Sequence, residues 1–307
     1  MFIVTIAPSE TAYADMGPKP SVNIEFIGLG DELCYATLLS EHDSTGPATV
    51  WDGNPDHAEH SGNYEYRDLS YETWKAFAEY EDSDGYYFLQ EAWVVNEYKE
   101  FAWTYYPPNP FKVLLYFPEQ NVFATSGIYE RYAFDSYFTI DVSDMEIVNG
   151  ESLADPDAVP ETPQLLPGIM IAEKSYNYGI EIVSLFARIV ATIAIELLIA
   201  LVFRFRQKKQ LILIGSVNVV TQVALNLALN IVNYNLGALS FIIAFFLFEV
   251  IVFVIEAIVY SIFIGRVSAP QRKGIEFKAL CIAYALIANI ASYAAGFAIS
   301  QLFPAMF

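Results

Sequence analysis

Four apolar runs in the second half of the chain constrain its fold more than any other feature. Each is long enough to cross the hydrocarbon core of a bilayer, which requires about 20 apolar residues in a helix. The runs cover residues 179–203, 211–232, 237–264 and 278–303. Because helices satisfy their own backbone hydrogen bonds in lipid, we predict a four-helix transmembrane domain over residues 179–307.

Basic residues indicate on which side of the membrane the loops lie. The loops at 204–210 and 265–278 each hold four Lys or Arg residues, whereas residues 233–237 hold none. Because basic loops stay in the cytoplasm, we predict a multi-pass protein of a bacterial-type plasma membrane. Both basic loops would then be cytoplasmic, and the N-terminal domain and the C-terminus would lie outside.

The two halves of the chain also differ in charge. Residues 1–178 hold 7 Lys and Arg against 31 Asp and Glu, and residues 179–307 hold 9 against 5. The net charge of −20 at neutral pH therefore belongs to the first half. Such acidity repels nucleic acid and anionic lipid, so no nucleic-acid partner is expected. Cations, basic partners and neutral ligands remain open.

The first residues have features of a signal peptide. Ala12-Tyr13-Ala14 is an A-x-A cleavage site. The apolar run before it, Phe2–Ala7, is shorter than the ~7–15 residues of a complete signal sequence. We interpret residues 1–14 as a signal-peptide remnant whose start lies upstream, and the alternative is an N-terminal tail.

Residues 15–148 have the pattern of a β-rich domain. In "SVNIEFIG", apolar and polar residues alternate, as in a strand with one buried face. Other aromatic and β-branched runs follow, and only Tyr71–Tyr80 has helical spacing. We predict a sandwich-like fold with one short helix. The chain would then be α+β in two parts, an extracytoplasmic β-rich domain plus a four-helix transmembrane bundle.

A segment rich in proline and acidic residues separates the two parts. It reads "GESLADPDAVPETPQLLPG" and holds four prolines. This composition is typical of an extended, solvated chain. We therefore predict a linker over residues 149–178.

Candidate metal ligands in the first half are sparse. Asp82 and Asp84 lie in a D-x-D-G fragment that fits part of a calcium loop, but the distal Glu of an EF-hand is missing. His57 and His60 are three residues apart, yet the Gly and Pro residues around them indicate an exposed loop. An acidic turn and an exposed loop are the favoured interpretations. We predict no metal site and no cofactor.

The predicted helices hold four ionisable side chains at depth, Arg188, Glu196, Glu249 and Glu256. Each costs at least ~2.5–3.5 kcal/mol at the bilayer centre, so they should face the bundle interior. Counting 1.5 Å per residue places Glu196 and Glu256 ~12 Å from the cytoplasmic face, and the other two ~22–24 Å from it. We predict a structural Arg188–Glu249 ion pair. Because two close carboxylates in low dielectric do not both ionise, Glu196 and Glu256 should hold a proton or a cation.

Amide side chains accompany the two lower glutamates. Asn218 lies at nearly the same depth, and Gln222, Asn226 and Asn230 continue from it at four-residue spacing on one helix face. The last helix adds Asn289. Such amides usually join helices by hydrogen bonds, and the alternative is that they line a small polar cavity. The predicted intramembrane polar cluster is Glu196, Glu256, Asn218, Gln222 and Asn289.

These residues form a pattern of N-x-x-T-Q on one helix, E-x6-E on the next and N-x-x-S-x3-G on the last. In this chain the three motifs are Asn218–Gln222, Glu249 to Glu256, and Asn289–Gly296. The pattern is similar to that of a group of prokaryotic multi-helix membrane proteins without an assigned activity. The resemblance covers residues 211–296 and implies no activity.

Two classes of function fit the sequence. A binding or accessory protein is favoured by the large acidic domain, which would engage an extracellular ligand or a partner protein. A proton- or cation-coupled transporter, or a subunit of one, is the alternative and is favoured by the buried carboxylates. Four helices are few for a transporter unless the chain forms a homo-oligomer.

An enzyme is disfavoured, because residues 179–307 contain no His and the chain lacks the GxSxG and Walker patterns. We therefore predict an integral plasma-membrane protein with an external binding domain, and with membrane lipid as its other partner.

Overall fold

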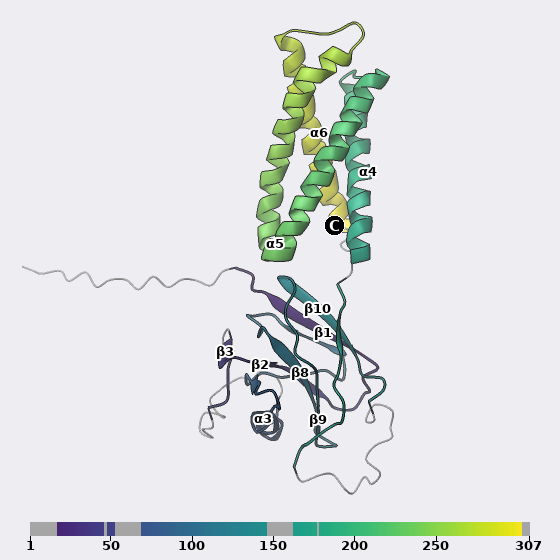
Figure 1. The fold of residues 1–307 in the computed structure, drawn as a ribbon. Coiled ribbons are helices and arrows are strands. Elements are labelled where there is room, and N and C mark those ends of the chain that lie inside the picture. Colours follow the sequence, from purple (N-terminus) through teal and green to yellow (C-terminus); the bar gives the residue numbers. More distant parts are fainter. Residues whose placement is uncertain (1–16, 46–47, 53–68, 146–161, 177, 303–307) are drawn as a thin grey trace, which may run out of the picture.

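The computed structural model describes residues 17–45, 48–52, 69–145, 162–176 and 178–302. It has a β-rich N-terminal part and a helical C-terminal part, which lie end to end (Figure 1). The predicted signal-peptide remnant and the two histidines His57 and His60 lie outside the described residues.

The β-rich part contains two main sheets. The first has the strand order β12-β10-β1-β7 and the second β11-β9-β8-β2-β5, with β6 also paired to β2. The strands of the first sheet are β1 (Ser21–Ile27), β7 (Glu100–Trp103), β10 (Asp135–Asp141) and β12 (Ala172–Lys174). Those of the second are β2 (Tyr35–Ser40), β5 (Tyr87–Phe88), β6 (Trp93–Val94), β8 (Phe111–Phe117), β9 (Val122–Thr125) and β11 (Gln164–Leu165). Strands β3 (Ser44–Thr45) and β4 (Ala48–Thr49) form a separate small hairpin.

One hydrophobic core lies between these two sheets. Val22, Ile24 and Phe26 point into it from β1, as the alternating pattern of that strand predicts. Strand β8 is buried along its whole length, because its second face packs against α3 (Tyr71–Ala78) through a further aromatic cluster. The predicted β-rich part with one short helix is thus confirmed in outline. Strand twist curves the sheets as a half barrel, and the sandwich-like stacking stays a prediction.

The predicted linker differs from the observed structure. From residue 162 the chain rejoins the β-rich part, since β11 pairs with β9 in one sheet and β12 pairs with β10 in the other. Short apolar stretches next to the prolines make this pairing favourable, because Met170 and Ala172 are buried in the core. The β-rich part therefore extends to about residue 176, and the connection to the first helix is short.

A buried ion cluster joins strand β8 to the turn after α3. Lys112 Nζ lies 2.5 Å from Asp82 Oδ1 and 2.9 Å from Asp84 Oδ2. Desolvation lowers the pKa of Lys112, but its hydrogen bonds to the two carboxylates outweigh this effect, and the net pKa lies above the ordinary 10.5. The stability that this cluster contributes through Lys112 is therefore complete below pH 10.5 and is lost as the pH rises through the raised pKa.

The helical part is built from α4 (Tyr178–Val202), α5 (Lys208–Val267) and α6 (Ile275–Leu302). All three are long and apolar enough to cross a membrane. α5 consists of two helices that meet at Gly237, where φ is 76° and ψ is −179°, and its halves run side by side (Figure 1). The four predicted helices therefore correspond to α4, the two halves of α5, and α6.

The exterior of the helical part differs from that of a water-soluble bundle. Its exposed residues include many large apolar side chains, such as Phe186 and Val190, whose exposed fractions are 64% and 66%. Buried positions include glutamates, asparagines and glutamines. Such an apolar exterior fits contact with lipid.

The turn within α5 lies against the β-rich part. The backbone N–H of Phe134 donates to the carbonyl of Tyr234 at 2.8 Å. A Cβ atom at Gly237 would lie 2.5 Å from the ring of Phe134, so only glycine permits this approach. The residues 204–210 and 265–278, which carry eight of the nine Lys and Arg side chains of residues 179–307, lie at the opposite end of the bundle (Figure 1).

Replacement of Lys112 by Met is expected to destabilise the β-rich part by about 3–5 kcal/mol, because it leaves the buried carboxylate of Asp82 without a cation. All four tryptophans lie in this part, at positions 51, 74, 93 and 103. Tryptophan fluorescence during urea unfolding of the detergent-solubilised protein therefore reports on it.

The matched control for Lys112→Met is Lys75→Met. Lys75 pairs with Glu79 at 3.5 Å on an exposed surface of α3, and the loss of such a pair costs only about 0.5 kcal/mol. Equal destabilisation by the two variants would contradict the account of the ion cluster.

Candidate functional site

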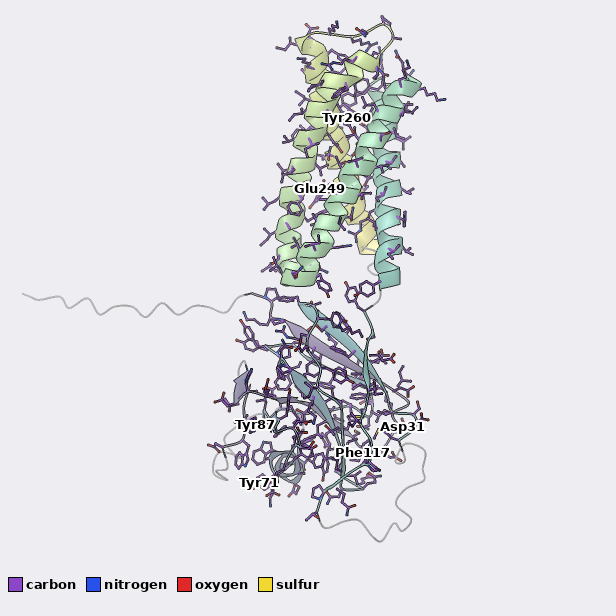
Figure 2. The ribbon with its side chains drawn as sticks, viewed as in Figure 1. Asp31, Tyr71, Tyr87, Phe117, Glu249 and Tyr260 are labelled. Carbon is purple, nitrogen blue, oxygen red and sulfur yellow. The ribbon has the colours of Figure 1, made fainter. Side chains whose placement is uncertain are left out.

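The candidate functional site lies where α4, both halves of α5 and α6 meet inside the bundle. Glu196 on α4 and Glu256 on α5 are both 0% exposed, as is Asn218 on the first half of α5. Figure 2 shows Tyr260 inside the bundle towards the basic end, with Glu249 nearer the β-rich part. The site is therefore deep in the bundle and closed on all sides.

Asn218 is the central contact of Glu196. Its Nδ2 donates to Glu196 Oε2 at 2.6 Å, and it also lies 3.0 Å from the hydroxyl of Tyr260. The other oxygen of the carboxyl group, Glu196 Oε1, is buried without a hydrogen-bond partner. The side-chain carbonyl oxygen of Asn218, Oδ1, is also buried without a hydrogen-bond partner.

Glu256 has a different environment. The hydroxyl of Thr221 donates to Glu256 Oε1 at 2.8 Å, and Asn289 Nδ2 donates to Glu256 Oε2 at 2.7 Å. Both oxygens of this carboxyl group therefore have a donor. Since Thr221 lies one turn from Asn218 on the same helix, a single turn of α5 contacts both glutamates.

The sequence-predicted cluster is only partly joined by side-chain hydrogen bonds. The structure pairs Glu196 with Asn218 and Glu256 with Asn289 through the bonds described above. Gln222 is also buried, and its backbone carbonyl accepts a hydrogen bond from Asn226 at 2.8 Å.

Three residues of the site were not predicted as members of the cluster. They are Thr221, Tyr260 and Tyr284, whose hydroxyl donates to the backbone carbonyl of Glu196 at 3.2 Å. Tyr260 lies four residues after Glu256, on the same face of α5, so helical spacing was a usable signal. Tyr284 offered no such signal, because its contact depends on how α6 packs against α4.

The other two ionisable side chains that the sequence places inside the helices, Arg188 and Glu249, lie closer to the β-rich part. Arg188 Nη1 donates to Asn226 Oδ1 at 3.3 Å, which joins α4 to the first half of α5. Glu249 is half-buried in the second half of α5. The Arg188–Glu249 ion pair stays a prediction.

The site has acidic groups and neutral donors. In the part of the chain that the structure describes, no Lys, Arg or His side chain pairs with Glu196 or Glu256. Two carboxylates without a cation in a low-dielectric interior cannot both carry charge. The arrangement is therefore suited to hold one proton or one small cation.

The weak metal candidates Asp82 and Asp84 have another role. Both bind the ammonium group of Lys112, which occupies the position that a cation would take. Among the described residues, no group of three or more His, Cys, Asp or Glu side chains is arranged to hold a metal ion.

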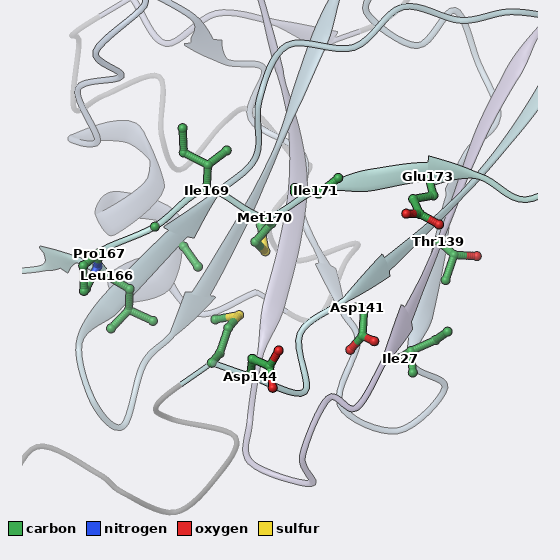
Figure 3. Close-up of a pocket in the computed structure, with 13 residues that line it drawn as sticks. Ile27, Thr139, Asp141, Asp144, Leu166, Pro167, Ile169, Met170, Ile171 and Glu173 are labelled. Carbon is green, nitrogen blue, oxygen red and sulfur yellow. The ribbon is translucent and has the colours of Figure 1, made fainter.

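A second candidate site is a pocket of about 660 Å³ at the side of the β-rich part (Figure 3). Its rim carries the carboxylates of Asp141, Asp144 and Glu173, and its walls include the exposed side chains of Ile169 and Ile171. Two hydrogen bonds from Ser143 lower the pKa of Asp141, so this carboxylate is ionised at neutral pH. The pocket thus combines negative charge with apolar surface.

Comparison of the chain with protein-family models, with curated protein sequences and with solved structures gives no match. The function must therefore be argued from the two sites themselves.

Replacement of Asn218 by Leu is expected to destabilise the helical part by about 0.6–2 kcal/mol, because it removes the contacts to Glu196 and Tyr260. Unfolding with SDS in mixed micelles measures this effect. The control is Asn235→Leu, since Asn235 Nδ2 bonds only the carbonyl four residues before it and the residue is exposed. Asn218 makes the same backbone contact, to Ile214. If both variants lose the same stability, the contact to Glu196 does not hold the helices together.

Proposed function

We propose that this chain is an integral membrane protein whose helical part binds and releases a proton or a monovalent cation at Glu196 and Glu256. It would act as an ion-coupled transporter or as a subunit of one. The observation that carries this proposal is the pair of fully buried carboxyl groups that are held by neutral donors alone.

The apolar exterior of the bundle supports its insertion in a plasma membrane. α4 has 25 residues, a length of about 37 Å at 1.5 Å per residue, which exceeds the ~30 Å hydrocarbon core. The β-rich part adjoins one end of the bundle, and the basic residues lie at the other (Figure 1). By the positive-inside rule, residues 204–210 and 265–278 are cytoplasmic, and the β-rich part and the C-terminus lie outside.

The cost of the buried acids is the main argument for ion binding. Inserting two glutamates at this depth in a membrane costs free energy. If hydrogen bonds between helices were all that is needed, asparagine or threonine could make them without a charge. A carboxyl group adds the capacity to change its charge. Because Glu196 and Glu256 lie on different helices, a change of charge at one alters the force between α4 and the second half of α5.

The site is closed, so exchange with solvent requires the helices to move. Glu196, Asn218, Glu256, Tyr260 and Tyr284 are all fully buried. A site that is occluded in one state and open in another is what coupled transport requires. Such movement would separate α4 from the second half of α5, which one turn of the first half of α5 now joins through Asn218 and Thr221.

Charge movement in proteoliposomes on a solid-supported membrane tests the proposal. A step in pH, or a step from choline to sodium chloride, is expected to give a transient current in the wild-type protein. The double variant Glu196→Gln/Glu256→Gln is expected to abolish that current, since it keeps the shape of both side chains but removes their charge.

The control for this experiment is Glu276→Gln, which removes an exposed carboxylate at the start of α6. This variant should keep the wild-type current. A current that survives in the double variant, or a wild-type protein that gives none, would refute ion exchange at this site.

A second candidate function is ligand binding by the β-rich part, and the acidic pocket of Figure 3 favours it. Exposed apolar surface beside three carboxylates suits a ligand that is both cationic and apolar. An extracellular ligand or a partner protein with a basic, apolar segment has this chemistry.

A fluorescent peptide of alternating Lys and Leu is a suitable probe for the pocket. The triple variant Asp141→Asn/Asp144→Asn/Glu173→Gln is expected to weaken its binding about tenfold or more, a loss of roughly 1.4 kcal/mol. The control neutralises the exposed acids Glu72, Glu81 and Glu119, which gives the same change in net charge. Equal losses in both variants would mean that the peptide responds only to overall charge.

A further inference from the structure

Two unpartnered oxygens in the candidate site belong to side chains that already touch each other. Glu196 Oε2 accepts a hydrogen bond from Asn218 Nδ2 at 2.6 Å. The remaining oxygen of each group, Glu196 Oε1 and Asn218 Oδ1, is buried and lacks a hydrogen-bond partner. Both are acceptors, and a buried acceptor without a donor is unfavourable. One hydrogen between them would satisfy both.

We propose that Glu196 is a neutral carboxylic acid that forms a two-bond acid–amide pair with Asn218, and that Glu256 carries the single negative charge of the site. In this pair the acid carbonyl accepts from the amide N–H, and the acid O–H donates to the amide carbonyl. The first of these bonds is present, and the second joins the two unpartnered oxygens. This inference rests on the proposed function and specifies its ion as a proton.

The hydrogen bonds of the two glutamates differ in a way that assigns the proton. Glu256 accepts one donor on each oxygen, from Thr221 and from Asn289. Donors stabilise the charged form of a carboxyl group. Glu196 accepts one hydrogen bond, from the amide N–H of Asn218, and the carbonyl oxygen of that amide is an acceptor without a donor. A protonated Glu196 would supply the missing donor. A shared site with one charge therefore places the charge on Glu256 and the proton on Glu196.

The groups that face Glu196 from the other helices agree with this assignment. α5 presents the side chains of Asn218, Tyr260 and Glu256, and α6 presents Tyr284, whose hydroxyl contacts the backbone carbonyl of Glu196. Asn, Tyr and Glu supply no positive charge to stabilise an ionised Glu196. The nearest basic residue on α4 is Arg188, two turns away, and its guanidinium group contacts Asn226.

Infrared spectroscopy of the full chain in lipid nanodiscs tests the proposal. A protonated carboxyl group has a C=O stretching band that is separate from the carboxylate bands and shifts in deuterium oxide. The Asn218→Leu variant is expected to move this band to higher frequency, because the acid carbonyl loses its donor. The Asn289→Leu variant is expected to leave it in place and to move a carboxylate band instead.

Further variants keep the test decisive if either leucine variant fails to accumulate. Asn218→Ser makes a smaller change at the same position, and Thr221→Val removes the other donor of Glu256. A band that shifts in Asn289→Leu or Thr221→Val, and not in the Asn218 variants, would place the proton on Glu256 and overturn the assignment. A wild-type protein without such a band at neutral pH would overturn it as well.

The infrared experiment and the charge-movement experiment can fail independently of each other. A band that responds to Asn218→Leu in a protein without transient currents would support the acid–amide pair and refute ion exchange. Currents that survive in choline chloride and follow pH, together with the expected band shift, support both. Currents that require sodium, with no acid band, would retain ion binding and refute the proton.

Discussion

The hydrogen bonds that Asn218 and Thr221 make to two glutamates are the interaction on which the helical part depends. A carboxyl group in contact with hydrocarbon is expensive, so Glu196 and Glu256 must turn inward and find donors. One turn of α5 supplies these donors to both, and Asn289 adds a third from α6. The remaining surface of the helices is then free to be apolar. The buried polar side chains and the apolar exterior are two consequences of one constraint.

The β-rich part is connected to this interior through α5. The turn of α5 contacts Phe134, at the start of β10, and only glycine fits at position 237. The two halves of the helix that meet at this turn carry the donors of the site and Glu256 itself. A movement of the β-rich part therefore acts on the helices that hold the carboxyl groups. This is a mechanical connection between the β-rich part and a buried ionisable site.

Much of the fold could be predicted from the sequence, because the apolar runs of the helices and the alternating pattern of the strands are strong signals. Long apolar runs and alternating strands depend on local chemistry, and both parts of the chain have the predicted character. The strands at residues 164–165 and 172–174 were not predictable, since proline-rich composition favours a linker and their pairing depends on distant strands. Residue depth suggested that Asn218 lies near Glu196, because rise per residue is constant in a helix, and the two side chains are in contact. It gave no information on helix rotation, which decides the contacts of Thr221 and Tyr284.

The central claim is that the bundle crosses a bilayer with the β-rich part and the basic end on opposite sides. Labelling of single introduced cysteines with a membrane-impermeant maleimide tests it most directly, since Cys34 and Cys281 are buried. The exposed positions Glu119 and Lys273 mark the two ends. The account predicts that Glu119→Cys is labelled in intact cells and that Lys273→Cys is labelled only after permeabilisation. Labelling of both positions in intact cells, or of Lys273→Cys alone, would contradict it.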